Sequence, residues 1–420
     1  MDGQGFIKDG ALAIKNGKIT FIGKSASVAS IEAETKINAK GKVAMPGLIN
    51  CHTHVPMTLF RGIAEDQPLN TWLKETIWPL EAKLRQEDIY DGALLGCLEM
   101  IKSGTTCFAD MYFHEDMVAK ATVKSGLRGV LAEGIIEAGN KMLGKTMLHK
   151  SVNFAKRFHG YADDRVRAML GPHAAYSCSP ELLKKISQKA SELKIGVHLH
   201  LAESKAMFGE FEKKYGFSEV EFLDNIGFLR NHVVAAHCIN LSRKDMYVLS
   251  KCGVNVVHVP VANMKLGLGA AKIKDLTDLN VNVCLGTDGP ASNNSLDMFE
   301  TIKAAALLQK FAYQNPTVMP AYEVLKMTTI NAAKALELAE NVGSLQAGKK
   351  ADIVLVNLAK PHLKPLHNIY ATIAYSARGS DVDTVIVDGK VLMENRQVKT
   401  LDEQYVMEKA EKTALSMLSR

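Results

Sequence analysis

Short apolar runs, each followed by polar residues, recur along most of the chain. The first two lie in GALAIKNGKITFIG (10–23), where Asn16-Gly17 separates them and predicts a β-hairpin. A later run, KVAMPGLIN (42–50), ends immediately before Cys51-His52-Thr53-His54. A buried strand that ends in polar residues is typical of the carboxyl end of a strand in an α/β barrel.

The same pattern returns seven more times. The later runs are GTTCFADM (104–111), LRGVLAEGI (127–135), VRAMLGPHA (166–174), IGVHLHLAE (195–203), HVVAAHC (232–238), GVNVVHVPVAN (253–263) and NVNVCLGTDG (280–289). Segments with helical periodicity, such as 182–194 and 242–252, lie between them. Alternating strands and helices imply a parallel sheet, and eight repeats imply that it closes. The sequence therefore predicts an α/β fold with a distorted (β/α)8 TIM barrel.

The two ends of the chain depart from this pattern. Short strands and turns return at 343–356 and 382–392, and they are similar in character to the opening hairpin. We therefore expect both chain ends to form one small, discontinuous β-sandwich domain. The predicted division assigns 1–45 and 342–420, with a terminal helix, to the small domain and 46–341 to the barrel.

Composition and charge exclude several classes of partner. Hydrophobic residues make up 47% of the 420 residues and charged residues 23%, so the chain can bury a large core. The formal charge of +6 comes from 51 basic and 45 acidic residues without a Lys/Arg block, so we expect no nucleic-acid partner. No segment is long and apolar enough to span a bilayer, so we expect no membrane partner. Seven cysteines without a C-x-x-C pair favour the cytoplasm, and we also expect a homo-oligomer.

Residue types that bind metals or move protons lie at the ends of several predicted strands. They are His52 and His54 at the first strand, His198, His200 and Glu203 at the fifth, His237 at the sixth and Asp288 at the eighth. The carboxyl ends of barrel strands carry the catalytic groups of barrel enzymes, and imidazole suits borderline metals such as zinc. Each residue alone also fits a hydrogen-bonded core histidine or a turn. A purely structural role for all of them together is much less expected.

Five segments resemble the amidohydrolase superfamily, and within it the adenine-nucleoside deaminases acting on methylthioadenosine, S-adenosylhomocysteine and 5′-deoxyadenosine. These segments are PGLINCHTHVPMTLFRGIAEDQPLNTWLKETIWPLEAKL (46–84), LGPHAAYSCSPELL (170–183), HLHLAES (198–204), AAHCINL (235–241) and LGTDGPASNN (285–294). The resemblance covers nearly the whole chain. It implies a metal-dependent hydrolytic deamination that turns an adenine nucleoside into its inosine analogue and ammonia.

The resemblance also implies roles for individual residues. One divalent metal is expected on His52, His54, His200 and Asp288. Zinc is favoured, and iron(II) and manganese are alternatives because three His and one Asp suit them nearly as well. Asp288 would take a proton from the attacking water, Glu203 would protonate N1 of the purine, and His237 would orient the attacking hydroxyl.

Substrate-binding residues follow from the same resemblance. Glu81 would accept hydrogen bonds from the ribose 2′- and 3′-hydroxyls, His173 would contact the nucleoside, and Trp72 would line the 5′ side. Glu203 and Asp288 would also touch the substrate. The spacing of Trp72 fits a packed helix face equally well, which leaves its role open.

The segment 132–146, after the third predicted strand, bears on the 5′ substituent. Relatives that favour S-adenosylhomocysteine carry arginines there, whereas this chain has none and carries Glu133 and Glu137. Since a guanidinium is the natural partner of a carboxylate and two acids repel it, we expect small 5′ groups to be preferred.

Three alternatives compete with this interpretation. Gly139–Thr146 matches the phosphate-loop pattern G-x-x-x-x-G-K-[ST] and follows a predicted strand, although Glu133 and Glu137 would bring negative charge near a phosphate. The same scaffold also supports guanine deamination or hydrolysis of a halogenated triazine, since a fold does not fix a substrate. Glu81 together with His173 favours a nucleoside. An inactive scaffold protein is expected to have lost metal ligands, and all four are present.

Overall fold

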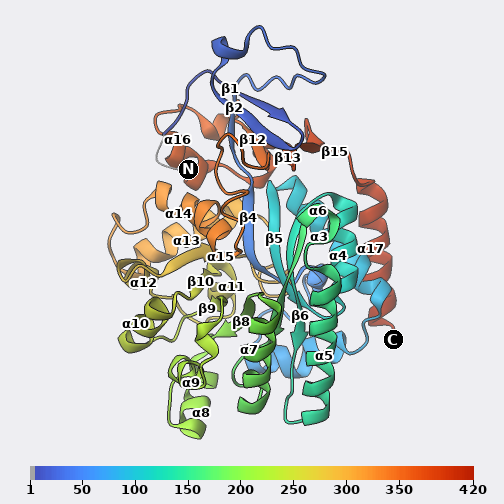
Figure 1. Ribbon diagram of the computed structural model, residues 1–420, viewed down its shortest axis with the longest axis vertical. Helices are drawn as coiled ribbons and strands as arrows, with labels where there is room; N and C mark the ends of the chain where they lie inside the picture. Colours follow the sequence, from blue (N-terminus) through green and yellow to red (C-terminus); the bar gives the residue numbers. More distant parts are fainter. Residues whose placement is uncertain (1–4) are drawn as a thin grey trace.

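The computed structural model describes residues 5–420 and contains an eight-stranded parallel sheet that curls into a barrel (Figure 1). In spatial order its strands are β4 (Leu48–Thr53), β5 (Thr105–Tyr112), β6 (Arg128–Ile135), β7 (Val166–Pro172), β8 (Val197–Leu201), β9 (Val233–His237), β10 (Asn255–His258) and β11 (Asn282–Leu285). Each predicted run overlaps one of these strands, so the expected barrel is confirmed.

The barrel is irregular where its first and last strands meet. Within residues 5–420 no regular ladder joins β4 to β11. Instead, the backbone N–H of Asp288 donates to the carbonyl of His52 at 2.9 Å. A Cβ added at Gly286 would lie 2.8 Å from the Cβ of His52, so only glycine permits this close approach. The distortion therefore brings the carboxyl ends of the first and eighth strands into direct contact.

Helices cover the outside of the barrel and close its amino-terminal end. The outer layer includes α3 (Gln86–Lys102), α4 (Glu115–Ser125), α5 (Lys141–Phe158), α7 (Pro180–Leu193) and α10 (Arg243–Cys252). Apolar strand residues such as Ile49 and Val257 pack inside the barrel with Ala332 of α15 (Ile330–Ala335). Because Asn282, at the start of β11, donates to the carbonyl of Asn331, α15 lies at the amino ends of the strands.

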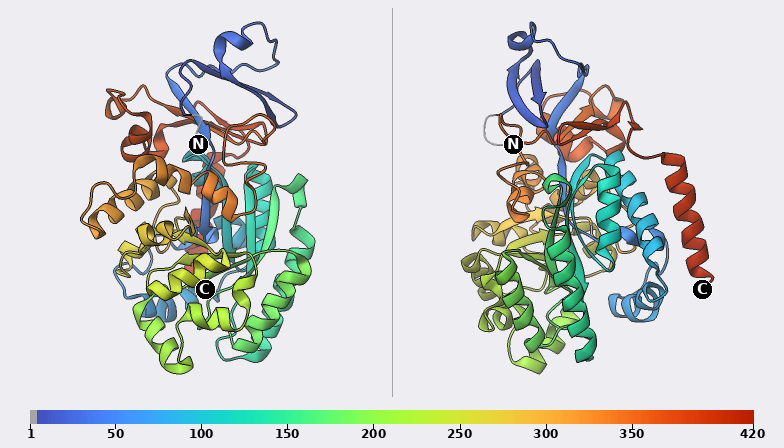
Figure 2. Two further views of the ribbon diagram at one scale, coloured as in Figure 1. Left: turned by 60° about the vertical axis from the view of Figure 1, so that its left-hand side comes forward. Right: turned by 45° about the vertical axis from the view of Figure 1, so that its right-hand side comes forward.

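The chain ends form the second unit (Figure 2). Its five-stranded antiparallel sheet has the order β15 (Gln397–Val398), β14 (Lys390–Glu394), β13 (Val382–Val387), β12 (Ile353–Asn357) and β3 (Lys42–Pro46). The predicted opening hairpin is β1 (Gly10–Lys15) and β2 (Lys18–Lys24), a two-stranded sheet with a bridge from Lys18 to Lys350.

The apolar run 42–50 contributes one strand to each of two sheets, although the sequence predicted a single strand there. The run is divided at Gly47 between β3 of the small sheet and β4 of the barrel. A Cβ at Gly47 would lie 2.0 Å from the Thr106 hydroxyl, so no side chain fits at the crossing point. The small sheet and the first barrel strand are therefore directly continuous.

The terminal helix α17 (Glu403–Leu418) was grouped with the small domain from the sequence but lies against barrel helix α3 (Figures 1 and 2). Thr413 donates to Asp91 at 2.7 Å, and Lys102 pairs with Glu403 at 2.8 Å. In the described part of the chain, no helix has the length and apolar character needed to cross a bilayer.

Candidate active site

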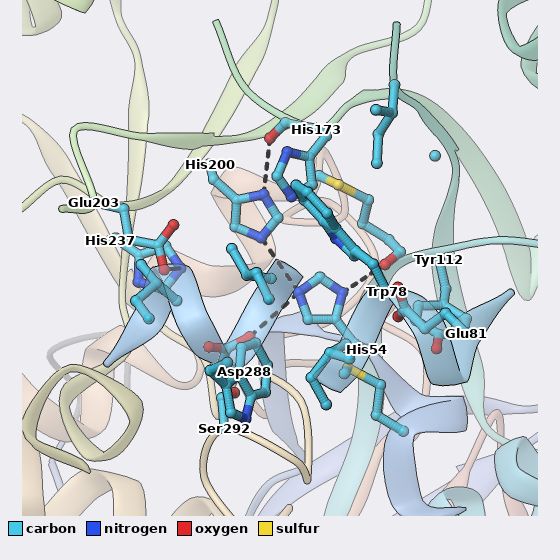
Figure 3. Close-up of a pocket in the computed structure, with 18 of the residues that line it drawn as sticks. His54, Trp78, Glu81, Tyr112, His173, His200, Glu203, His237, Asp288 and Ser292 are labelled. Atoms are coloured by element: carbon cyan, nitrogen blue, oxygen red, sulfur yellow. Dashed lines mark hydrogen bonds and ion pairs between the residues drawn. The ribbon is translucent and has the colours of Figure 1, made fainter. Parts of the chain in front are cut away.

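A cavity opens at the carboxyl ends of the barrel strands (Figure 3). Eight of the nine residues predicted as metal ligands, catalytic groups or substrate contacts line it, namely His54, Trp72, Glu81, His173, His200, Glu203, His237 and Asp288. The ninth, His52, is completely buried and lies next to His54 and His200. The structure therefore brings these nine residues together.

A β-bulge shapes the strand end that carries His52 and His54. Between Asn50 and Thr53, β4 advances three residues while β5 advances two. Asp110 of β5 then accepts hydrogen bonds from the Thr53 hydroxyl at 2.5 Å and from the Val55 N–H at 2.7 Å. Because these bonds lie on either side of His54, they fix the direction of its side chain.

Four side chains converge on one point at the floor of the cavity. The Nε2 atoms of His54 and His200 lie 3.2 Å apart. Asp288 Oδ1 lies 3.3 Å from Nε2 of His54 and 3.4 Å from Nε2 of His52. These side chains come from β4, β8 and the turn after β11, so the irregular junction of the barrel completes the cluster.

Hydrogen bonds on the far side of each ring fix which nitrogen faces this point. His54 Nδ1 donates to the Met111 carbonyl at 2.6 Å, and His200 Nδ1 donates to the His173 carbonyl at 2.8 Å. His52 Nδ1 lies 2.9 Å from Nε2 of His198, while His52 Nε2 has no hydrogen-bond partner within residues 5–420. When both rings are neutral, the Nε2 lone pairs of His54 and His200 point toward each other. A cation between the two nitrogens stabilises this arrangement. Three imidazoles and one carboxylate with fixed outer contacts fit a single divalent metal.

The electrostatics of the cluster favour a positive charge at its centre. Burial lowers the pKa of His52 to about 4 and that of His200 well below its ordinary value, so both rings are neutral at neutral pH. Burial also acts on His54, but the hydrogen bond and charge of Asp288 overcome it and raise the pKa of His54 to about 9. The two rings next to Asp288 in turn hold its pKa well below the usual range despite burial.

Glu203 and His237 lie together beside this cluster (Figure 3), and a ring nitrogen of His237 is within 4.8 Å of ligand atoms of both His52 and Asp288. Glu203 Oε1 is 3.6 Å from His237 Nε2, and His237 Nδ1 is 3.0 Å from the amide oxygen of Asn263. Burial raises the pKa of the Glu203 carboxyl. The site thus combines a carboxyl that retains its proton more readily than usual with a buried imidazole held in a fixed direction.

The substrate-side residues come from an irregular helical segment over the cavity. Trp72 begins a π-helical turn, η3 (Trp72–Ile77), which leads into α2 (Trp78–Glu81). Trp72 packs in the core and also lines the cavity, while its place at the 5′ side of a substrate stays a prediction. Burial raises the pKa of Glu81 to about 7. On the other wall, His173 Nδ1 lies 3.1 Å from the Ser177 hydroxyl.

A model of the family described as "Amidohydrolase family" matches residues 43–392. The chain belongs to the amidohydrolase family. It is 48% identical over 416 residues to a 5′-deoxyadenosine deaminase of Methanosarcina acetivorans, covering 99% of this chain and 95% of the relative. It is 47% identical over 410 residues to a 5-methylthioadenosine/S-adenosylhomocysteine deaminase of Desulforudis audaxviator, covering 97% and 95%.

A solved structure supports the same family relationship. The fold of this amidohydrolase matches a crystal structure of an adenosine deaminase from Xanthomonas campestris with bound zinc. The TM-score is 0.95 and the sequence identity 30%, and the match covers 99% of this chain and 95% of the other. The barrel, the small sheet and their arrangement are therefore those of a known zinc-binding deaminase.

Glu133 and Glu137 of the amidohydrolase do not act as predicted. The Glu133 carboxylate accepts hydrogen bonds from the backbone N–H groups of His114 and Glu115, at 3.3 and 2.8 Å. Glu137 accepts one from the Ser179 N–H at 2.9 Å. Both acids are buried in these structural roles and neither lines the cavity, so the expectation that they repel a substrate carboxylate is wrong.

The phosphate-loop hypothesis is also wrong. Helix α5 begins at Lys141, and Asn140 caps it by accepting hydrogen bonds from the N–H groups of Met142 and Leu143, both at 3.1 Å. Six of the eight motif residues are therefore helical. Gly144 is buried against Leu182 and Glu137. A loop whose N–H groups surround a phosphate does not form here.

Several cavity residues were not found in the sequence. Tyr112 is the last residue of the second barrel strand, Phe113 follows it, and Ile136 follows the third strand. Their positions at or just beyond strand ends were the available signal, but apolar and aromatic side chains at such positions are also typical of the hydrophobic core. Among the described residues that line the cavity there is no lysine or arginine.

Proposed function

We propose that this amidohydrolase catalyses the metal-dependent hydrolytic deamination of adenine nucleosides to the inosine analogue and ammonia. The observation that carries the proposal is the convergence of three imidazole Nε2 atoms and the Asp288 carboxylate at the floor of the cavity, with His237 and Glu203 directly beside them. The relatives named as deaminases support the reaction type.

We propose His52, His54, His200 and Asp288 as the metal ligands. The fixed tautomers of His54 and His200 support this set, and so does His52 Nε2, which makes no hydrogen bond among the described residues and lies 3.4 Å from Asp288 Oδ1. Zinc is the proposed metal, as in the similar adenosine deaminase structure, with iron(II) or manganese as alternatives. When bound, the metal makes a water molecule acidic enough to attack at neutral pH.

The protein's own groups then move the protons. Asp288 accepts a proton from the attacking water and delivers it to the departing amino group. Glu203, with its raised pKa, donates a proton to N1 of the purine, so the ring can accept the nucleophile at C6. His237, held by Asn263, donates a hydrogen bond that orients the attacking hydroxyl.

The cavity also supports a choice of nucleoside. Glu81 is proposed to accept hydrogen bonds from the ribose hydroxyls, His173 to contact the nucleoside, and Trp72 to line the 5′ side. Phe113 and Ile136 add apolar walls. Because the described lining offers no lysine or arginine to an amino-acid carboxylate, we propose that 5′-deoxyadenosine and 5′-methylthioadenosine are preferred to S-adenosylhomocysteine, with adenosine accepted more weakly.

The test is to measure kcat/KM for these four nucleosides with zinc-, iron(II)- and manganese-loaded protein. The missing carboxylate contact should make S-adenosylhomocysteine worse than 5′-deoxyadenosine by roughly tenfold to a hundredfold. Absence of turnover with all four nucleosides in every metal form contradicts the deaminase proposal. A preference for S-adenosylhomocysteine contradicts only the 5′ specificity.

We further propose a cytoplasmic homo-oligomer. All seven cysteines lie within the described residues and none forms a disulfide there, which supports a reducing compartment. Light scattering after size-exclusion chromatography tests the assembly, and a monomeric mass contradicts it.

A further inference from the structure

The two turns that carry Glu203 and His237 have an unusual backbone. Ala202, immediately before Glu203, has φ of 50°, and His237 and Cys238 have φ of 72° and 50°. Residues with a Cβ rarely adopt this left-handed region, and they remain there only where surrounding contacts hold them. The contacts that hold these turns therefore bear on the direction of the catalytic side chains.

The turn before Glu203 is held from two sides. The N–H of Ala202 donates to the carboxylate of Glu219 at 2.9 Å, and Glu219 lies at the start of α9 (Glu219–Asn225) with only 2% of its surface exposed. From the other side, the backbone N–H of Asn240 donates to the Ala202 carbonyl at 2.9 Å. The side-chain amide of Asn240 donates to the Glu203 carbonyl at 3.0 Å.

These bonds also tie the two turns to each other. Asn240 lies three residues after His237, and the N–H of Cys238 donates to the Leu201 carbonyl at 2.9 Å. The peptide between Ala202 and Glu203 is thus fixed between α9 and the turn after β9. Neither Glu219 nor Asn240 lines the cavity, so neither touches a substrate directly.

We propose that Glu219 and Asn240 are positioning residues that hold Ala202 in its left-handed conformation and so direct the Glu203 carboxyl into the cavity beside His237. The inference rests on the proposed function, because it concerns the residue that protonates the purine. Burial raises the pKa of Glu219 to about 7, and a neutral carboxyl still accepts a hydrogen bond from Ala202. The proposed role rests on the acceptor oxygen that holds the Ala202 N–H, and a neutral side chain can supply it.

The first test compares Glu219→Leu, which removes the acceptor, with Glu219→Gln, which keeps it. Glu219→Leu should lower kcat for 5′-deoxyadenosine on the order of 10- to 100-fold, while KM and the bound metal stay unchanged. Glu219→Gln should retain kcat within about threefold. The matched control is Glu221→Leu on the same helix, whose carboxylate pairs with the exposed Lys244 and which should keep wild-type kcat.

Two results of this comparison overturn the proposal. An equal loss in Glu219→Gln and Glu219→Leu shows that charge matters rather than the hydrogen bond. Loss of metal in Glu219→Leu shows that the residue acts through the ligand His200. If Glu219→Leu does not fold, Asn240→Ala serves as the test instead. Its kcat should fall by about tenfold at unchanged metal content. A wild-type kcat in Asn240→Ala overturns the proposal.

A glycine substitution at position 202 and a crystal structure of the Glu219→Leu variant provide two further tests. Ala202→Gly combined with Glu219→Leu should regain part of the lost kcat, because glycine adopts positive φ without support; no recovery contradicts the conformational argument. A crystal structure of Glu219→Leu should show the Glu203 carboxyl turned away from His237. This last measurement does not depend on turnover, so an inactive wild-type protein would refute the deaminase proposal while an unmoved Glu203 would refute this one.

Discussion

The two ends of the barrel strands both contain buried polar groups, but these groups are paired in different ways. At the amino ends, apolar strand residues pack on α15, and the buried Arg128 is paired with Asp352 by two hydrogen bonds of 3.1 and 3.2 Å. At the carboxyl ends, His52 Nε2 is buried without a hydrogen-bond partner in the described chain. Since an unpaired buried polar group is costly, the carboxyl ends keep bonding capacity for a ligand while the amino ends supply stability.

Removal of the metal should have the largest effect on the carboxyl ends of the barrel strands. A chelator is expected to eliminate deamination and to lower the melting temperature, because the imidazoles and Asp288 lose their common ligand. Zinc added back should restore both quantities, measured by absorbance assay and calorimetry. The control is protein dialysed without chelator. Full activity at less than a tenth of an equivalent of metal per chain would contradict the ligand assignment.

Glu203→Gln should have the next largest effect, and it separates proton transfer from metal binding. The amide cannot donate a proton to N1, so kcat should fall by about a thousandfold or more while the metal content stays at one ion per chain. Steady-state kinetics and elemental analysis of the same preparation measure both. His237→Ala should lower kcat less, because water can fill the space. A Glu203→Gln variant with near wild-type turnover would exclude Glu203 as the acid.

Arg128→Met tests the amino-terminal end of the barrel. Breaking the buried pair leaves Asp352 unpaired, so the free energy of unfolding should fall by about 3–5 kcal/mol in urea denaturation. The double variant Arg128→Met/Asp352→Leu should be much closer to wild type, since no charge is left unpaired. Both should keep wild-type kcat where they are folded. A large loss of kcat with unchanged stability would mean that the two ends are not functionally distinct.

The smallest expected effect is the pH dependence of ribose binding. Burial raises the pKa of Glu81 to about 7, so the carboxyl gains a proton as the pH falls through 7 and loses part of its acceptor capacity. KM for 5′-deoxyadenosine should therefore rise by up to about tenfold below pH 7. Glu81→Gln should remove this pH dependence. For 2′,3′-dideoxyadenosine, which lacks the hydroxyl donors, KM should be independent of pH in the same range; a parallel rise would contradict the role of Glu81.

The sequence predicted best those features that depend on strand ends. His200, Glu203, His237 and Asp288 were found because parallel strands bring their carboxyl ends together, whatever the local conformation. Glu133 was placed wrongly, since the sequence shows an acid near the end of a strand but not that two backbone N–H groups at the start of the preceding helix, α4, donate to its carboxylate.

Other features depended on contacts that a single sequence does not display. The left-handed Ala202 and its acceptor Glu219 are 17 residues apart and have no motif in common. The division of the run 42–50 was missed because both halves are equally apolar, and only the close approach of Thr106 explains why Gly47 lies between them.

Because β3 and β4 are continuous, the barrel is not suited to being expressed or transplanted as a separate domain. Met45 and Pro46 pair with Val354 and Ile353 of the small sheet, and His52 follows Gly47 by only five residues. A protein engineer who trims the chain to residues 46–341 removes the anchor of the strand that presents the first two histidines. Swapping the small unit between homologues carries the same risk, so transplantation experiments should exchange β3, β4 and β12 together.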